Sequence, residues 1–317
     1  MTRLLLAGAL VAALSQALSA AELLLQNAWI DAHKNRALVE ATFTVDRSHA
    51  TPNSAAKDGD LHVAGRAPAV GLPLVVEVVN ARLDAHKPLL QQVKAAEKSK
   101  VPVTLAGVWR LWFEHPGRHT HTQGASVPVP KNTNPDHVFE IHPVTHFSDG
   151  TLDDSLEESF VDIKGYSPAD ATRAFEHYER QVFTVNKGAT FTSIQAKQAG
   201  FNYSRFAMVL TSLPKPTVKR SPDGKSRIDE GGLVVLARVE TLDGKQVLTA
   251  APRRMVFVPG TAPRNRVATA QIGDRFQVIG IPRINLERLM KSANAKPGRS
   301  VAVKGAYEII VVGMLDE

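Results

Sequence analysis

The order of strand and helix patterns in the first half of the chain constrains the fold more than any other feature of the sequence. Residues 37–45 (ALVEATFTV) alternate between two faces, which is typical of a strand. A helix is predicted from Pro88, because Leu89, Val93 and Ala96 recur at helical spacing on one face. The predicted order is three strands, a helix and two strands, with the strands at residues 37–45, 61–64, 74–79, 101–113 and 138–145.

Three strands, a helix and two strands are the elements of an OB-fold, a small five-stranded barrel. Such barrels bind ligands on the face of strands 2 and 3 and through the loops that join strands 1 to 2 and 4 to 5. Both loops are long here, at residues 46–60 and 114–136, whereas most connections in compact domains have about 4 to 6 residues. The sequence therefore predicts a ligand or partner site formed by these two loops.

The second half of the chain predicts another mainly β domain with a few helices, of α+β or sandwich-like type. We place the barrel domain at residues 22–147, an acidic and polar linker at 148–160 and the second domain at 161–317. Ser167 is the predicted N-cap of a helix that runs to about Arg180. Low-complexity tracts and evident repeats are absent from the sequence.

Several strands and one more helix are expected in this second domain. Asp243-Gly244 predicts a hairpin turn between strands at residues 233–240 and 246–250. A short helix is expected from its cap Asn285 to Ser292. Further strands are predicted at residues 255–258, 276–281 and 306–312.

The first 21 residues have the features of a secretory signal peptide. Arg3 precedes an apolar run from Leu4 to Leu14, and Ser19-Ala20-Ala21 supplies the small residues of a cleavage site. The alternative is a membrane anchor, but a spanning helix needs about 20 apolar residues, and polar residues interrupt this run. We expect a mature chain that begins near Ala21 or Glu22, in the periplasm or outside the cell, without an integral membrane span.

The net charge of +7 lies mainly in the second half of the chain. Residues 22–150 carry 13 basic and 13 acidic side chains, whereas residues 151–317 carry 24 and 18. A basic half could favour an anionic polymer or an envelope component as partner. Because the cations are dispersed and blocks such as Lys219-Arg220 are short, solubility alone is the alternative explanation.

The loop FEHPGRHTHTQG (residues 113–124) places three histidines within seven positions of a chain that has no cysteine. Neutral imidazole binds Zn²⁺ or Cu²⁺, so His115, His119 and His121 are candidate metal ligands. Arg118, His119 and His121 are candidate ligand-binding residues in the same loop. The alternative is a solvated loop, because structural zinc sites have more regular ligand spacing.

Five ionisable residues lie on or beside the predicted strands of the barrel. Asp60 and His62 flank the start of the second strand, Glu77 lies between valines in the third, and Glu140 and His142 share one face of the fifth. One interpretation is that they converge as an acid/base or metal constellation, in which case they are candidate ligand-binding residues. The other is that hydrogen bonds from them hold the barrel closed.

Trp109 and Trp112 lie three positions apart in the predicted fourth strand, so they point to opposite faces. One could be exposed beside the long loop, where it could stack on a sugar or a base, and both are therefore candidate ligand-binding residues. The alternative is that both are buried. Nucleophile-elbow, phosphate-loop and dinucleotide motifs are absent from the sequence.

Two segments resemble a group of exported bacterial OB-like domain proteins of unassigned function. These are DGDLH (residues 58–62), which matches the D-G-D-x-H segment of the group, and EIHPV (residues 140–144), which matches its E-(I/L)-H-P-V segment. The resemblance covers roughly residues 37–147. It implies a barrel and a location outside the cytoplasm, and it implies no catalytic role. The loop between strands 4 and 5 departs from the pattern, because it is longer and richer in histidine.

These features lead to an exported, non-catalytic protein that binds a ligand or partner through the long loops of an OB-like barrel. The alternative is a metal-dependent hydrolase with a His/Glu site in the N-terminal domain, since eight of the eleven histidines lie between His62 and His146. A third hypothesis is a scaffold of an envelope assembly, with the basic second half as its contact surface. No cofactor other than a divalent metal, Zn or Cu, is indicated.

Overall fold

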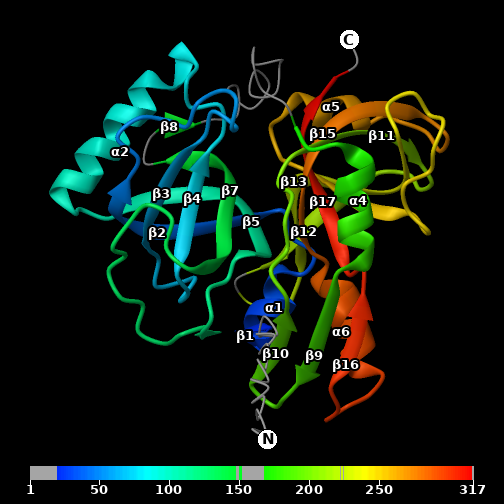
Figure 1. Ribbon diagram of the computed structural model, residues 1–317, viewed down its shortest axis with the longest axis horizontal. Helices are drawn as coiled ribbons and strands as arrows, with labels where there is room; N and C mark the ends of the chain where they lie inside the picture. Colours follow the sequence, from blue (N-terminus) through cyan, green and yellow to red (C-terminus); the bar gives the residue numbers. More distant parts are fainter. Residues whose placement is uncertain (1–19, 148–149, 152–167, 222, 224, 316–317) are drawn as a thin grey trace, which may run out of the picture.

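The computed structural model describes residues 20–147, 150–151, 168–221, 223 and 225–315 (Figure 1). This part of the chain is mainly β, as the sequence predicts. The predicted linker lies outside the described residues, apart from β8 (Gly150–Thr151). The helices described are α1 (Asn27–His33), α2 (Lys87–Ser99), α4 (Ala171–Arg180), α5 (Ala262–Val267), α6 (Leu286–Asn294) and the short 3-10 helix η1 (Asp84–His86).

The first half of the chain forms a closed five-stranded barrel, which confirms the prediction. The strands pair in the order β4, β3, β2, β5 and β7, and a parallel pairing of β7 with β4 closes the ring. The remaining pairs are antiparallel. The strands are β2 (Leu38–Ser48), β3 (Leu61–Arg66), β4 (Leu74–Val78), β5 (Val103–His115) and β7 (His137–Phe147).

The predicted alternation of β2 places Val39, Ala41, Phe43 and Val45 in the core. Gly107 lies where β5 bends against β7, and a Cβ at this position would be 2.4 Å from Ile141 Cγ2. Only glycine fits such a close approach, and the strand pairing shifts register here.

Helix α2 covers one end of the barrel, as its apolar face predicts. Leu89, Val93 and Ala96 are buried against the barrel core. Lys100 ends the helix in the left-handed region at φ 59°, and its ammonium group donates to Asp46 O of β2 at 2.8 Å. The helix is thereby tied to the end of the strand that it covers.

The second half of the chain contains another ring of five paired strands with the same connectivity. Around the ring, the strands follow the order β14, β13, β11, β15 and β17, and all of these neighbours are antiparallel. A parallel pairing of β17 with β14 closes the ring. Helix α5 follows the third strand of this ring, as α2 does in the first. The strands are β11 (Ser204–Leu210), β13 (Arg227–Glu240), β14 (Arg253–Phe257), β15 (Arg275–Ile284) and β17 (Tyr307–Met314), with β12 (Lys215–Arg220) added beside β13. The chain thus repeats one barrel, although no repeat is evident in the sequence.

The two barrels meet along β5 and β15 through reciprocal contacts. Arg110 on β5 donates from Nε to Pro282 O at 2.9 Å, and Arg283 on β15 donates from Nη1 to Trp109 O at 3.0 Å. An apolar group that includes Val108 and Ile281 fills the space beside them. The interface therefore has approximate two-fold character.

A third sheet joins segments that are far apart in the sequence. Its strand order is β16, β9, β10, β1, β6, so the first described strand is in its interior. It lies at the lower end of the second barrel in Figure 1. Its strands are β1 (Ala21–Gln26), β6 (Thr120–Thr122), β9 (Val182–Lys187), β10 (Phe191–Ala196) and β16 (Val301–Lys304).

Two predicted details of the second half were wrong. Helix α4 is capped by Asp170, which accepts from Arg173 N–H at 3.0 Å, whereas the predicted cap Ser167 lies outside the described residues. The turn at Asp243-Gly244 is present, with φ 72° at Gly244, but only an isolated bridge follows it. β13 pairs with β14 instead, because that strand carries the apolar residues that continue the core. The cap predicted at Asn285 is confirmed, since it accepts from Arg288 N–H at 2.8 Å.

Candidate functional site

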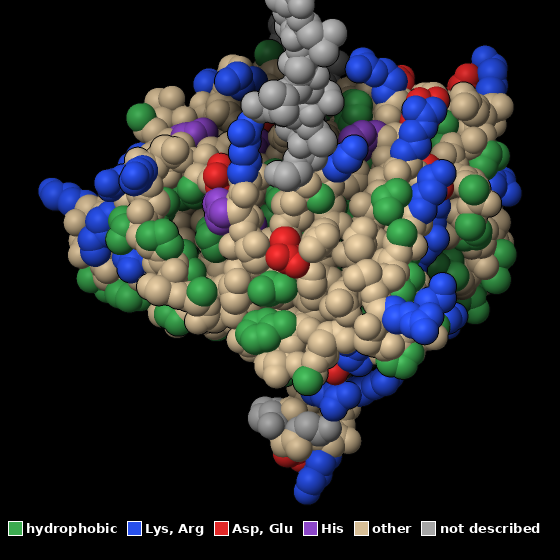
Figure 2. Space-filling model, turned by 60° about the horizontal axis from the view of Figure 1, so that its bottom comes forward, with side chains coloured by type: hydrophobic (Ala, Val, Ile, Leu, Met, Phe, Trp, Pro, Cys, Tyr) green, Lys and Arg blue, Asp and Glu red, His purple; other side chains and the backbone are tan. Residues whose placement is uncertain are grey.

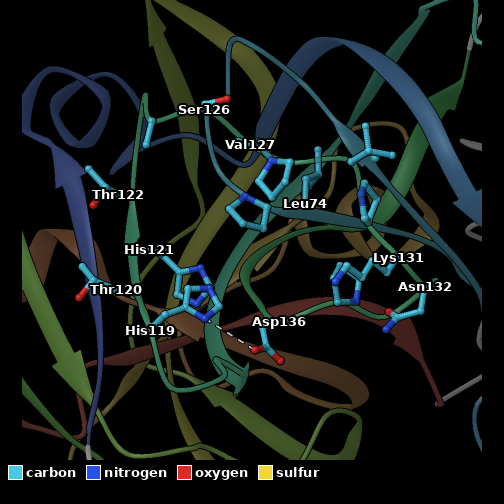
Figure 3. A pocket seen from close by; sticks show the side chains of 17 residues that line it. Leu74, His119, Thr120, His121, Thr122, Ser126, Val127, Lys131, Asn132 and Asp136 are labelled. Carbon is cyan, nitrogen blue, oxygen red and sulfur yellow. Dashed lines mark ion pairs between the residues drawn. The ribbon is translucent and has the colours of Figure 1, made fainter.

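The histidine-rich loop encloses a cavity of about 640 Å³ at one end of the first barrel (Figure 3). Figure 3 shows Thr120 and Thr122 on one side of it and Lys131 and Asn132 on the other, with Leu74 of β4 behind. The remaining wall is largely apolar and consists of residues 125–130, Pro73 and Pro135. A volume of this size falls within the range of small-molecule pockets.

Hydrogen bonds to the first barrel and to β1 hold this loop in place. β6 pairs in parallel with β1. Gln123 accepts from Gln26 N–H at 2.9 Å and donates to Val70 O at 2.9 Å. Gly124 N–H donates to Gly71 O at 2.8 Å. These hydrogen bonds hold residues 120–124, part of which line the cavity, as expected when loop backbone groups are satisfied by neighbouring strands.

His119 and His121 lie side by side in this loop, with ring centroids 4.4 Å apart. His119 is exposed, and its Nδ1 lies 3.7 Å from Asp136 Oδ2. His121 is buried with Nε2 2.7 Å from Pro116 O, and burial lowers its pKa. Gly117 brings Asp136 close, because its φ of 62° lets the turn pack where a Cβ would lie 2.1 Å from the carboxylate.

The three histidines predicted as metal ligands do not meet at one point. His115 stacks instead on His137, with ring centroids 5.4 Å apart. Among the described residues, the group whose ligand atoms all lie within 4.8 Å of one another is Asp60, Glu77 and His142. Arg118, also proposed as a ligand-binding residue, is exposed and does not line the cavity.

The two long loops lie at opposite ends of the barrel. β2 and β5 are antiparallel, so the loop after β2 and the loop after β5 leave from opposite ends. A ligand in the cavity of the loop after β5 therefore lies at the other end of the barrel from the loop after β2. Trp109 and Trp112 are both buried, which leaves neither exposed for stacking.

The ionisable residues predicted from the strands do converge. Glu77 pairs with His62 across β3 and β4, and His142 lies beside Glu77 on β7. His142 Nδ1 is 3.2 Å from Glu77 Oε2 and 3.5 Å from Glu140 Oε2, and His142 Nε2 is 3.6 Å from Asp60 Oδ2. Asp60 and His142 are fully buried, because the second barrel covers this outer face of the first.

Tyr203, which precedes β11, connects this cluster to the second half of the chain. Its hydroxyl donates to Asp60 Oδ2 at 2.6 Å and lies 2.5 Å from His142 Nε2. Asn80 N–H donates to the other oxygen of Asp60 at 2.9 Å. These contacts fix the orientation of the His142 ring and leave its Nδ1 facing Glu77.

A second part of the cluster is a charged group around Glu140. Arg110 donates from Nη1 to Glu140 and from Nη2 to Glu114 at 2.9 Å, and His137 Nε2 is 3.2 Å from Glu140 Oε1. Burial alone would raise the pKa of Glu140, but Arg110 and His137 hold that pKa well below its usual range. Glu140 is therefore ionised and paired.

The other two carboxyl groups of the cluster behave in the opposite way. Burial raises the pKa of Glu77 to about 8, against an opposing effect of His142. Burial and the neighbouring Asp58 charge raise the pKa of Asp60 well above its usual range. Burial lowers the pKa of His62. Carboxyl groups whose pKa values are driven apart in this way are a feature of functional sites.

The second barrel provides an internal comparison for these residues. Val76 pairs with Ile141 in the first barrel and Met255 with Ile309 in the second, so Glu77 corresponds to Val256 and His142 to Ile310. His62 pairs with Glu77 as Val234 pairs with Val256. By the same register, Asp60 corresponds to Gly232.

The charged pair, by contrast, is present in both barrels. Arg110 lies opposite Glu140 on β5 and β7, and Arg283 lies opposite Glu308 on β15 and β17. Arg283 Nε donates to Glu308 at 2.6 Å. The Arg–Glu pair therefore belongs to the architecture of the interface, whereas the Asp60, His62, Glu77 and His142 set is specific to the first barrel. A barrel of this connectivity closes without that set, which weighs against the interpretation that these residues hold it closed.

Sequence reasoning missed Tyr203 and the charged residues around Glu140, namely Arg110, Glu114 and His137. Tyr203 lies outside any predicted element and reaches Asp60 across the barrel interface. Arg110 is the single charged residue of an otherwise apolar strand (VTLAGVWRLWF). A charged side chain in a buried strand needs a partner of opposite charge, and this rule would have identified Arg110 as a candidate. No protein-family model matches the chain, and no curated protein matches it significantly.

Proposed function

We propose that the protein is an exported, non-catalytic binding protein whose ligand occupies the cavity beneath the loop of residues 116–136. The observation that carries this proposal is a largely apolar cavity of about 640 Å³ in the loop between barrel strands 4 and 5. The order of the five strands supports an OB-like interpretation of the barrel, and in OB-folds this loop is one of the places where ligands bind. The same strand order supports the resemblance to exported OB-like domain proteins.

The lining of the cavity indicates the chemistry of its ligand. Apolar side chains such as Val127 and Pro128 supply contact area, and His119, Lys131 and Asn132 supply hydrogen bonds. Lys131 adds a positive charge, while the carboxylate of Asp136 lies 3.7 Å from His119. An amphipathic molecule with an anionic group fits this combination, as an envelope component would. A polymer bound over the basic second half has less support, because Lys and Arg side chains are dispersed over the face shown in Figure 2.

Export is part of the same proposal. The signal-like segment ends where β1 begins, at Ala21, and this strand pairs with β10 and β6. In the described part of the chain, none of the helices combines the length and apolar character needed to cross a membrane. Fractionation of the native host with detection of the processed N-terminus would test the location.

Binding of the amphipathic anion 1-anilinonaphthalene-8-sulfonate tests the cavity. We expect one saturable site, weakened about tenfold or more in Ala125→Trp, which fills the cavity, and in the double variant His119→Ala with Lys131→Ala. Arg118→Ala is the matched control, because Arg118 is exposed on the same loop outside the cavity. Equal binding by all four proteins would refute the site.

A metal-dependent hydrolase is the second candidate function, and the Asp60, Glu77 and His142 group favours it. A catalytic metal needs an open coordination position that the substrate reaches, whereas Asp60 and His142 are fully buried. Zn²⁺-dependent hydrolysis of chromogenic esters or phosphoesters that Glu77→Gln abolishes would support it. Failure to hydrolyse these substrates with added Zn²⁺ would leave the binding function.

A further inference from the structure

We propose that Asp60, Glu77 and His142 bind one divalent transition-metal ion between the two barrels, in a site separate from the loop cavity. The chemical class is that of an ion that accepts one imidazole nitrogen and carboxylate oxygens, for which Zn²⁺ is the natural probe. The proposal does not depend on the ligand of the loop cavity. It also requires no catalysis, so it goes beyond both functions proposed above.

The donor atoms have the separations that such an ion requires. With metal–ligand bonds of about 2.0 to 2.2 Å, neighbouring ligand atoms of a tetrahedral site lie about 3.3 Å apart. Glu77 Oε2 is 3.2 Å from His142 Nδ1. One ligand atom each from Asp60, Glu77 and His142 lies within 4.8 Å of the others. The Glu77–His142 separation already matches such a site, whereas Asp60, which lies 3.6 Å from His142 on the Nε2 side, must move closer when an ion binds.

Two of these atoms lack hydrogen bonds despite being buried. Within the described structure, Glu77 Oε2 and His142 Nδ1 have no hydrogen-bond partner. Glu77 is 4% exposed and His142 is fully buried. An unsatisfied buried polar atom costs about 1 to 3 kcal/mol, and here two of them face each other. A bound cation satisfies both at once.

The hydrogen bonds around the site have the arrangement of a metal outer shell. A metal-bound histidine commonly engages its other ring nitrogen in a hydrogen bond that fixes the ring. Tyr203 does this for His142 through Nε2, and Asn80 N–H fixes the carboxylate of Asp60. Arg110 remains paired with Glu140 and Glu114, so its positive charge has carboxylate partners of its own.

The second barrel identifies the site as an addition to the fold. At the corresponding positions it has Gly232, Val234, Val256 and Ile310, which are apolar or carry no side chain. Apolar residues at these positions allow the same strands to close. The two carboxyl groups and two imidazoles at the equivalent place in the first barrel lower the stability of the fold, because ionisable groups lose hydration when they are buried. A specific ion would offset this loss.

His62 is the side chain of this set nearest to solvent. Its Nε2 is 3.7 Å from Glu77 Oε2, and the His62 side chain is 15% exposed. His62 stacks on the half-buried His49, with ring centroids 4.8 Å apart.

Titration of tag-free protein with Zn²⁺ by calorimetry, with elemental analysis after dialysis, tests the proposal. We expect one ion per chain and an increase in Tm of about 5 °C when free Zn²⁺ exceeds Kd a hundredfold. The decisive variant copies the second barrel into the first by His62→Val, Glu77→Val and His142→Ile. It should bind no ion at this site, and Glu77→Gln should weaken binding at least tenfold.

A matched control separates this site from the loop. His119→Ala removes an imidazole from the loop cavity and should leave Zn²⁺ binding unchanged, whereas it should weaken binding of the anionic dye. Absence of stoichiometric Zn²⁺ binding by the unmodified protein would overturn the proposal. Binding that persists in folded Glu77→Gln and is lost in His119→Ala would also overturn it, because the ion would then belong to the loop.

Discussion

Replacement of Tyr203 by phenylalanine should destabilise the protein by about 3 kcal/mol. The hydroxyl group serves two buried partners, Asp60 Oδ2 at 2.6 Å and His142 Nε2 at 2.5 Å. Each buried polar group that loses its partner costs about 1 to 3 kcal/mol. Asp60 keeps its hydrogen bond from Asn80 N–H, so we take a value of about 1.5 kcal/mol for each of the two losses.

Urea unfolding in the presence of a chelator measures this loss. Intrinsic fluorescence reports on Trp109 and Trp112, which are buried in the first barrel, and far-UV circular dichroism reports on both barrels. We expect a lower midpoint with an unchanged slope, because the change affects stability rather than the surface exposed on unfolding. Both probes should shift together, since Tyr203 links the two barrels.

Tyr178→Phe is the matched control. Tyr178 is also buried, but its hydroxyl lies at the longer distances of 3.3 and 3.4 Å from the carbonyl oxygens of Phe201 and Asn202. Its loss should be smaller, about 1 kcal/mol or less. An effect of Tyr203→Phe no larger than that of Tyr178→Phe would refute the shared hydrogen bond as an energetic link between the barrels.

Three further outcomes follow from the described structure. Arg283→Met should destabilise the protein by about 3 kcal/mol in urea unfolding, because it removes the donor at 2.6 Å from the buried Glu308, which then keeps Arg254 at 3.2 Å. No change in the midpoint would contradict this. Gly107→Ala should lower the free energy of unfolding by about 1 to 3 kcal/mol, because its Cβ would meet a side chain of β7 at 2.4 Å. Gly200→Ala should be nearly neutral, because no atom lies within 4 Å of its Cβ. Equal effects of the two changes would refute the close approach. Burial lowers the pKa of His33 to about 4 in the folded protein. Below pH 6.5 the unfolded chain therefore takes up a proton on His33 that the folded protein does not. The free energy of unfolding should fall by up to about 3 kcal/mol between pH 6.5 and pH 4. Denaturation curves across this range should show a weaker pH dependence in His33→Gln, and an unaltered dependence would exclude His33 as its source.

The first barrel was predictable because its strands obey simple patterns. The alternation of β2 and the apolar face of α2 each fix one element, and the order of elements then fixes the barrel. The second barrel was not predictable at this level. Its strands β14, β15 and β17 are buried on both faces, so they lack alternation, and β12 is inserted between β11 and β13.

For the candidate sites, contacts within one strand were predictable and contacts between the two halves of the chain were not. The spacing of Glu140 and His142 on one face correctly placed them on the same side of a strand, and the structure brings both to Glu77. The partner Tyr203 comes from the other half of the chain, and no local pattern indicates such a contact. Trp109 packs on Trp29 of α1, and Trp112 packs on Tyr178 of α4 and Phe183 of β9. These elements lie outside the strands of the first barrel, so its own pattern does not predict that both tryptophans are buried.

The interior position of β1 has a consequence for the order in which the chain can fold. This strand lies between β10 and β6, and the sheet ends at β16, so residues separated by most of the chain length must meet before it is complete. Contacts of such long sequence separation slow folding, because loop closure costs entropy before the contacts form. A nascent chain cannot finish this sheet until residues 301–304 have been synthesised, and β1 lacks its antiparallel partner until residues 191–196 have followed it.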